Sequence, residues 1–179
     1  MNRHGAEYLY GVLSEDARNI CKSIPLLFPD DPDTFARPSS AVRSSRSAIV
    51  DRTSASDLLY LELWSLFEVF NRSYNFKLST IEEPIQIIRY ADGGCVDWHI
   101  DVGDYSNGLE RKLSISVQLS SSTDYSGGDL EFIAQPSAPF SRTLGTVIGF
   151  PSYCAHRVTQ VKRGERFSLV AFALGEPFV

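Results

Sequence analysis

The stretch Leu113-Ser114-Ile115-Ser116-Val117-Gln118-Leu119 alternates apolar and polar side chains along its whole length. A period of two is typical of a β-strand that turns one face toward a core and the other face elsewhere. Further segments of strand character, bounded by turn residues, surround it at 85–90, 96–101, 129–133, 146–150, 157–161 and 167–174. Asp124 to Gly128 is interpreted as a turn. The second half of the chain is therefore predicted to be rich in β-structure.

The first part of the chain has helical character. Ser14 is positioned to cap a helix that ends before Pro25, and Ser56 to cap a second one. The second helix carries a wide apolar stripe formed by Leu58, Leu59, Leu61, Leu63, Leu66, Phe67, Val69 and Phe70. Residues 29–56 between them combine prolines, serines and arginines, and we interpret them as a loop or irregular strand. That loop is either solvated and ion-paired or a lid that faces a substrate.

Helices followed by many short strands predict an α+β fold, a double-stranded β-helix (jelly roll) with supporting N-terminal helices. We expect one domain over residues 1–179, with mainly helical support and loop in 1–80 and the jelly-roll core in 84–178.

Charge, cysteine content and the lack of long apolar runs indicate which partners and which cellular compartment to expect. The chain has 179 residues and a formal net charge of −5, which does not favour binding to nucleic acids or anionic membranes. Its cysteines, Cys21, Cys95 and Cys154, follow no zinc-like spacing and are interpreted as reduced thiols. The N-terminus lacks an apolar signal-peptide core, and no run reaches the ~18 apolar residues of a membrane span. We expect a cytoplasmic protein; the sequence leaves the oligomeric state open.

The candidate chemistry begins at His99-Ile100-Asp101. Alternate residues of a strand share a face, so His99 and Asp101 can direct an imidazole and a carboxylate to one point. His156 follows far downstream, and two histidines with one carboxylate form the facial triad of non-haem Fe(II) oxygenases. The alternative is that both histidines are buried and serve only the fold.

Arg166 and Ser168 lie two residues apart on a predicted strand beyond His156. A guanidinium and a hydroxyl that project together form a receptor for a small carboxylate. The alternative for Arg166 is a surface ion pair.

With these motifs the chain resembles the 2-oxoglutarate- and Fe(II)-dependent dioxygenases, in particular their prolyl 4-hydroxylase-like branch. The resemblance extends from about Pro84 to Phe178. It rests on Arg89-Tyr90, Trp98-His99-Ile100-Asp101, Arg111-Lys112-Leu113-Ser114, Gln118-Leu119-Ser120, Gly127-Gly128-Asp129-Leu130, Phe150-Pro151-Ser152, His156-Arg157-Val158 and Arg166-Phe167-Ser168.

The resemblance implies a role for each of these residues. His99, Asp101 and His156 would hold Fe(II), and Arg166 with Ser168 would bind the distal carboxylate of 2-oxoglutarate. Tyr90 stands where the family often has a tyrosine that contacts the cosubstrate, and Gln118 where some relatives also have a tyrosine. Each has an alternative: Tyr90 as part of an aromatic core, and Gln118 as an inward polar residue bonded to the backbone.

The implied reaction is hydroxylation of a C–H bond with decarboxylation of 2-oxoglutarate to succinate and CO2. O2 is the other cosubstrate, and ascorbate is a candidate reductant. A peptidyl proline is the first substrate to consider, followed by a free amino acid or another small molecule. Nucleic-acid demethylases with this triad carry a second arginine where this chain has Phe172. A non-catalytic metal-binding jelly-roll module and, more remotely, a zinc hydrolase stay open as other classes.

Two alternatives are open for Trp98 and for Cys154, and one interpretation is given for Tyr105. Trp98 and Tyr105 are expected either to line a substrate entrance or, for Trp98, to lie in the core. Cys154 either approaches the metal or is a small buried residue.

Overall fold

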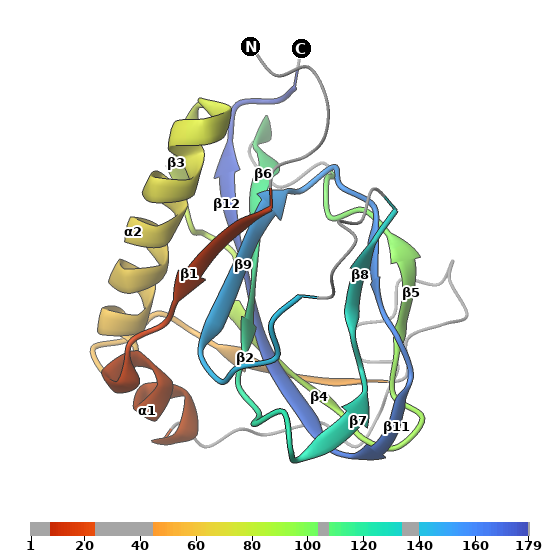
Figure 1. Ribbon diagram of the computed structural model, residues 1–179. Coiled ribbons are helices and arrows are strands. Elements are labelled where there is room, and N and C mark those ends of the chain that lie inside the picture. Colours follow the sequence, from red (N-terminus) through yellow and green to blue (C-terminus); the bar gives the residue numbers. More distant parts are fainter. Residues whose placement is uncertain (1–7, 24–44, 104–107, 134–139, 179) are drawn as a thin grey trace.

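Two layers of antiparallel β-structure face each other, and helices cover the outer side of the larger layer (Figure 1). The computed structural model describes residues 8–23, 45–103, 108–133 and 140–178. The helices are α1 (Glu15–Ser23) and α2 (Asp57–Tyr74). The strands are β1 (Leu9–Val12), β2 (Arg46–Val50), β3 (Leu78–Thr80), β4 (Ile85–Tyr90), β5 (Val96–His99), β6 (Glu110–Gln118), β7 (Tyr125–Gly127), β8 (Leu130–Phe132), β9 (Thr146–Pro151), β10 (His156–Val158), β11 (Val161–Gly164) and β12 (Arg166–Gly175).

The larger sheet has the strand order β1-β9-β6-β12-β4-β2, and β3 also pairs with β12. The facing layer consists of β5-β10-β8 and of the pair β11-β7. The long central strands β6 and β12 are antiparallel, with Ser168 opposite Gln118. Strands distant in sequence thus meet at the centre, and both layers are needed to enclose the space between them.

The alternation along β6 divides the molecule into two cores. Leu113, Ile115 and Val117 belong to the apolar cluster beneath the helices. The intervening Ser114, Ser116 and Gln118 are buried as well, and strand geometry directs them to the opposite face, between the two layers. The predicted period of two is confirmed, and the sheet's inner face receives the polar residues.

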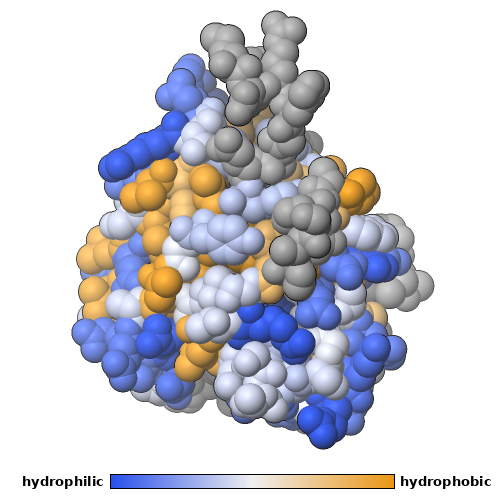
Figure 2. Space-filling view, viewed as in Figure 1, coloured by the Kyte–Doolittle hydropathy of each residue, from blue (hydrophilic) through white to orange (hydrophobic). Residues whose placement is uncertain are grey.

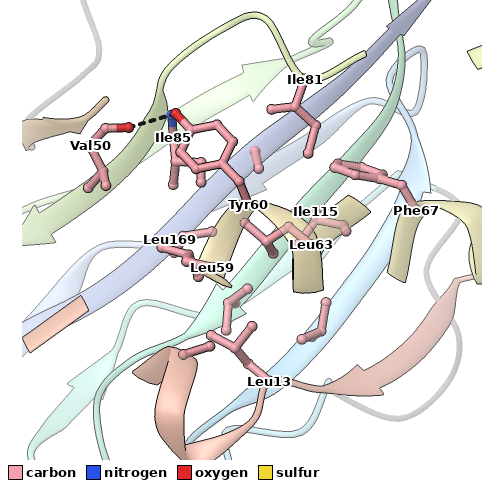
Figure 3. Close-up of a cluster of buried hydrophobic side chains, with 14 of the residues drawn as sticks. Leu13, Val50, Leu59, Tyr60, Leu63, Phe67, Ile81, Ile85, Ile115 and Leu169 are labelled. Carbon is pink, nitrogen blue, oxygen red and sulfur yellow. Dashed lines mark hydrogen bonds between the residues drawn. The ribbon is translucent and has the colours of Figure 1, made fainter. Parts of the chain in front are cut away.

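Helix α2 packs on the outer face of the larger sheet through Leu59, Leu63 and Phe67, which meet sheet residues such as Ile115 and Leu169 (Figure 3). The approach is close at Gly149 on β9, where an added Cβ would lie 2.2 Å from the ring of Phe70. Glycine at this position therefore allows the helix to lie against the strand.

The Tyr60 hydroxyl joins this helix to the sheet. It donates a hydrogen bond of 2.8 Å to the Val50 carbonyl (Figure 3) and accepts one of 3.3 Å from the Ile85 amide. A buried phenol is thus satisfied by two strand ends.

The predicted apolar stripe of α2 is wider than the buried one. Leu58, Leu61 and Val69 are each about half exposed. Figure 2 shows apolar atoms gathered on the side where α2 and β1 lie. No helix in the described ranges has the length and apolar character needed to cross a membrane.

The two predicted helix caps have different outcomes. Ser14 Oγ accepts a hydrogen bond from the Ala17 amide at 3.1 Å, as expected of a cap. The prediction for Ser56 was wrong, because its hydroxyl donates to the Asp51 carbonyl at 2.6 Å and accepts from the Thr53 amide at 2.8 Å. Ser56 thus stabilises the loop before α2 and leaves the helix uncapped by a side chain.

The N-terminal half contributes more than helices and loop. β1 and β2 form the two edges of the larger sheet, so the jelly roll draws strands from outside residues 84–178. Most of the predicted loop of residues 29–56, namely residues 29–44, lies outside the described residues. The predicted turn at Asp124–Gly128 contains strand β7, which pairs with β11.

Candidate metal centre and anion pocket

Strand pairing brings the two histidines together. β5 and β10 are antiparallel with His156 directly opposite His99, and their ring centroids lie 4.2 Å apart. Asp101 follows the end of β5, and its amide donates to the Ser152 carbonyl at 2.8 Å. One ligand atom from each of the three residues lies within 4.8 Å of the others.

Backbone carbonyls fix the orientation of both imidazoles. His99 Nδ1 lies 2.8 Å from the Asp97 carbonyl, and His156 Nδ1 lies 2.9 Å from the Cys154 carbonyl. A carbonyl only accepts, so in each ring Nδ1 carries the proton and Nε2 keeps its lone pair. The Nε2 atoms lie 3.5 and 3.6 Å from the Asp101 carboxylate oxygens. Both lone pairs and the carboxylate are therefore available to one cation.

One serine holds the carboxylate, and a second serine supports the first. The Ser114 hydroxyl donates to Asp101 Oδ2 at 2.7 Å, and its oxygen lies 3.0 Å from the Ser152 hydroxyl. Sequence reasoning quoted both serines within its motifs but gave neither a role. The signal was present in the period of β6, which placed Ser114 on the polar face.

The protonation states suit a metal site. Burial alone would raise the pKa of Asp101, but the hydrogen bond and charge interaction with His99, the charge interaction with His156 and the Ser114 hydroxyl together lower it. Burial lowers the pKa of His156 and outweighs the raising effect of Asp101. At neutral pH the carboxyl is thus ionised and the His156 imidazole is neutral, which are the forms that bind metals.

This donor set fits Fe(II). Two imidazole nitrogens and one carboxylate oxygen form the facial arrangement of non-haem iron sites, and each ligand has a fixed outer partner. The side chains of Asp101 and His156 are about nine-tenths buried, whereas His99 is 37% exposed. One side of the site is therefore open to an incoming molecule.

A buried guanidinium lies in the same inter-sheet layer. Arg166 begins β12 opposite Tyr90 and is only 3% exposed. Its Nη2 donates to Gln118 Oε1 at 3.1 Å, and its Cζ lies 5.1 Å from the Tyr90 ring centroid. Nε and Nη1 are buried without a hydrogen-bond partner among the described residues. Unpaired buried donors of a charged group are costly, so the guanidinium fits a carboxylate, which accepts on one edge from Nη2 together with Nε or Nη1.

The remaining predicted residues surround Arg166. Ser168 is fully buried on the same strand, opposite Gln118. The Gln118 amide bonds to two side chains, Arg166 and Tyr125, rather than to the backbone. Tyr90 is buried in the inter-sheet cluster, as its core alternative predicts, and its ring also faces the guanidinium. The structure thus gathers the four predicted residues around one point.

Sequence reasoning missed two residues of this pocket, Tyr125 and Arg142, which line it together with Gln118 and Arg166. Arg142 Nε donates to the Tyr125 hydroxyl at 3.2 Å, and its Cζ lies 4.2 Å from the centre of that ring. No periodic signal marks Arg142, which precedes β9 in a polar segment.

Two neighbours of the triad have other roles. Trp98 alternates with His99 on β5 and is 41% exposed, with Arg157 Cζ at 4.8 Å from its ring centroid. It therefore lies on the outer face of the small sheet, neither in the core nor beside the metal ligands. Burial raises the pKa of Cys154 to about 11, so its thiol stays protonated and is a poor metal ligand. Tyr105 lies outside the described residues.

Comparison with solved structures supports the same architecture. A prolyl-4-hydroxylase from Pseudomonas putida superimposes with a TM-score of 0.69 at 18% identity, over 98% of this chain and 94% of that one. A Trichoplax adhaerens prolyl hydroxylase, in complex with a hypoxia inducible factor oxygen degradation domain peptide fragment, gives 0.66 at 16% identity over 97% and 85%. The predicted double-stranded β-helix is confirmed.

Sequence comparison extends to the family. A PKHD-type hydroxylase from Synechococcus sp. (strain CC9902) is 32% identical over 99 residues, which is 55% of this chain and 44% of that protein. The matched stretch therefore covers less than half of that relative. The family model of the 2OG-Fe(II) oxygenase superfamily matches residues 85–174, from β4 to β12. With that match and the ligand set enclosed by those strands, the chain belongs to the 2OG-Fe(II) oxygenase superfamily.

Proposed function

We propose that this protein is an Fe(II)- and 2-oxoglutarate-dependent dioxygenase that hydroxylates a C–H bond, with a peptidyl proline as the first substrate to test. One observation carries the proposal: a two-histidine, one-carboxylate set and a buried guanidinium with two unpaired nitrogens occupy the same layer. When bound, iron and 2-oxoglutarate supply O2 activation coupled to decarboxylation to succinate and CO2. A metal-binding scaffold or a zinc hydrolase would need the first feature but not the second.

In this proposal the metal is held by Nε2 of His99, Nε2 of His156 and one carboxylate oxygen of Asp101. Arg166 pairs with the distal carboxylate of 2-oxoglutarate, and Ser168, Gln118 and Tyr90 complete its surroundings. The fixed Nδ1–H bonds keep the imidazoles in the ligating tautomer without further reorganisation.

The inner face of β6 connects the two ends of the site. Ser114, beside Asp101, and Gln118, beside Arg166, are four residues apart on one face, which corresponds to about 13 Å along an extended strand. Side chains from both ends reach inward over this span. Binding a diacid at its distal end therefore fixes its keto-acid end toward the metal. The entropy lost in orienting that end is then compensated by binding and does not add to the reaction barrier.

A peptide substrate is supported by the similar Trichoplax adhaerens enzyme, whose structure contains a peptide fragment. The open side at His99 is compatible with a large substrate that stays mostly outside. A free amino acid or another small molecule is the alternative outcome of the test.

The test is succinate formation by the anaerobically iron-loaded protein after addition of 2-oxoglutarate, ascorbate and air, with and without proline-rich peptides. We expect iron-dependent succinate and a peptide product heavier by one oxygen atom. Asp101→Ala should abolish both, whereas Asp92→Asn, at an exposed turn, should leave both unchanged. Succinate without any peptide effect would refute the peptidyl substrate, and absence of succinate and of 2-oxoglutarate binding would refute the oxygenase itself.

A further inference from the structure

The pocket beside Arg166 contains more hydrogen-bonding groups than the predicted clamp. Gln118, Tyr125, Asp129 and Arg142 line it together with Arg166. Their mutual hydrogen bonds restrict where each proton can point, and the restriction decides which groups are left for a ligand.

The orientation of the Gln118 amide is fixed first. Arginine only donates, so the Gln118 atom 3.1 Å from Arg166 Nη2 must be the carbonyl oxygen Oε1. The amide nitrogen Nε2 then faces the other way, where it donates to the Tyr125 hydroxyl oxygen.

The Tyr125 hydroxyl oxygen therefore accepts twice. Gln118 Nε2 is one donor, and Arg142 Nε, 3.2 Å away, is the other. A phenolic oxygen has one proton to donate besides its acceptor sites, and the structure assigns that proton no acceptor among the residues it describes. It must point away from both donors, and Tyr125 lines the pocket beside Arg166.

We propose that Tyr125 is a further binding residue for the distal carboxylate of 2-oxoglutarate, and that Arg142 and Gln118 are positioning residues that leave its hydroxyl proton free to donate. Three donors without a partner then meet in one pocket: Tyr125 O–H, Arg166 Nε–H and Arg166 Nη1–H. A carboxylate accepts from Tyr125 O–H and from one edge of the guanidinium, which joins Nη2 with either Nε or Nη1.

The backbone around Gly128 supports this grouping. Gly128 has φ +65°, and a Cβ there would lie 3.0 Å from Arg166 Cδ and 3.4 Å from Tyr125 Cε2. The glycine lets the link from β7 to β8 pass directly over Arg166, which holds Tyr125 beside the guanidinium.

Arg142 has two tasks in this arrangement. It fixes Tyr125 from three sides, through the stacked ring, the hydroxyl and the Tyr125 carbonyl at 3.2 Å. It also lies 3.7 Å from the Asp129 carboxylate, whose negative charge would otherwise stand unbalanced at the wall of an anion pocket. Loss of Arg142 should therefore weaken anion binding without changing the metal ligands.

The inference rests on the proposed function, so the test separates the two. Calorimetry on the anaerobic Fe(II)-loaded protein compares 2-oxoglutarate with 2-oxobutanoate, which keeps the chelating keto acid but lacks the distal carboxylate. A native protein that binds 2-oxoglutarate no more tightly than 2-oxobutanoate contradicts the proposed clamp as a whole.

Tyr125→Phe keeps the ring beneath Arg142 and removes the donor. A hydrogen bond to a charged group accounts for about 10- to 100-fold in affinity, so we expect a loss of that size for 2-oxoglutarate. The affinity for 2-oxobutanoate should stay within about twofold. Tyr60→Phe is the matched control, since it removes a buried hydroxyl with two hydrogen bonds on the other side of the sheet and should affect neither ligand.

Arg142→Met should weaken the affinity for 2-oxoglutarate by about three- to tenfold, the effect of one misplaced hydrogen bond. Arg142→Lys should recover part of that loss, because it restores the positive charge beside Asp129. Native 2-oxoglutarate affinity in Tyr125→Phe would overturn the inference. Equal losses for both keto acids would overturn it too, because they would mean a general structural role. Should Tyr125→Phe fail to fold, Arg142→Met and Arg142→Lys decide by the same ratio of affinities.

Discussion

Replacement of Arg166 by methionine separates cosubstrate binding from metal binding most directly. The side chain lies in the inter-sheet layer, and two of its nitrogens are buried without a partner. Methionine fills most of the same volume with flexible apolar atoms, so the fold should persist. Arg166 pairs with Gln118, whereas the metal ligands pair with one another and with Ser114, so iron affinity should be unchanged.

The magnitude follows from the two hydrogen bonds that a carboxylate accepts on one edge of the guanidinium, from Nη2 and from one of the unpaired nitrogens. Each is charge-assisted and contributes roughly 1.5–3 kcal/mol, so their loss amounts to about 3–6 kcal/mol. That corresponds to an affinity for 2-oxoglutarate about 10²- to 10⁴-fold weaker. At a concentration about 100 times the native dissociation constant, the native fold gains about 2.7 kcal/mol from ligand binding, and the variant about 0.4 kcal/mol or less.

Thermal unfolding of the anaerobic Fe(II)-loaded protein measures this difference. For a chain of this size, 2.7 kcal/mol raises the native midpoint by about 5–11 °C, and Arg166→Met should show a rise of about 1–2 °C at most. Arg163→Met, on the exposed side of β11, is the matched control and should keep the full rise. A full rise in Arg166→Met would refute the reasoning, because the carboxylate would then have another principal partner.

Three further predictions concern the surroundings of the site. The Asp101 carboxyl has a lower pKa in the folded than in the unfolded state, so it stabilises the fold above its ordinary pKa and that contribution is lost as the pH falls through the folded value. Ser114→Ala removes one cause of the lowering, so in denaturant titrations of the metal-free protein the loss should be smaller and should be complete at a higher pH than in the native chain. Gly149→Ala places a methyl group against the Phe70 ring and should lower the free energy of unfolding in urea by about 1–3 kcal/mol; an unchanged midpoint would mean that α2 moves aside freely. Burial raises the pKa of Cys154 to about 11, so iodoacetamide should label it at neutral pH far more slowly in the folded than in the urea-unfolded protein.

The parts of the fold that local pattern controls were predictable. The alternation along residues 113–119 specified a strand with different faces, and the structure places its apolar face beneath the helices and its polar face between the sheets. Ser14 was identified as a cap because an N-cap depends on neighbours in sequence. Ser56 has the same residue type and position relative to its helix, but the loop before it offers a stronger partner in the Asp51 carbonyl.

Features that depend on strand order were not predictable from one sequence. β1 and β2 join the larger sheet through partners about 40 to 140 positions away, and neither strand is long enough to carry a clear period. The stretch around Tyr125 contains two glycines and a serine, which favour a turn, but pairing with β11 makes it a strand. Tertiary pairing thus outweighed local preference there.

The same division applies to the candidate site. His99, Asp101, His156 and Arg166 could be selected from the sequence because each has a chemically restricted role and two pairs have strand spacing. Tyr125 and Arg142 could not, since their relevance lies in how many donors meet one oxygen atom, and this depends on β7, β8 and the segment before β9 lying side by side. A residue whose chemical type alone suits it to a ligand can be recognised in the sequence. A residue that binds a ligand because its neighbours occupy its other hydrogen-bonding sites cannot. The affinity ratio between 2-oxoglutarate and 2-oxobutanoate is for this reason a sharper probe of the pocket than turnover, which the predictable residues alone would dominate.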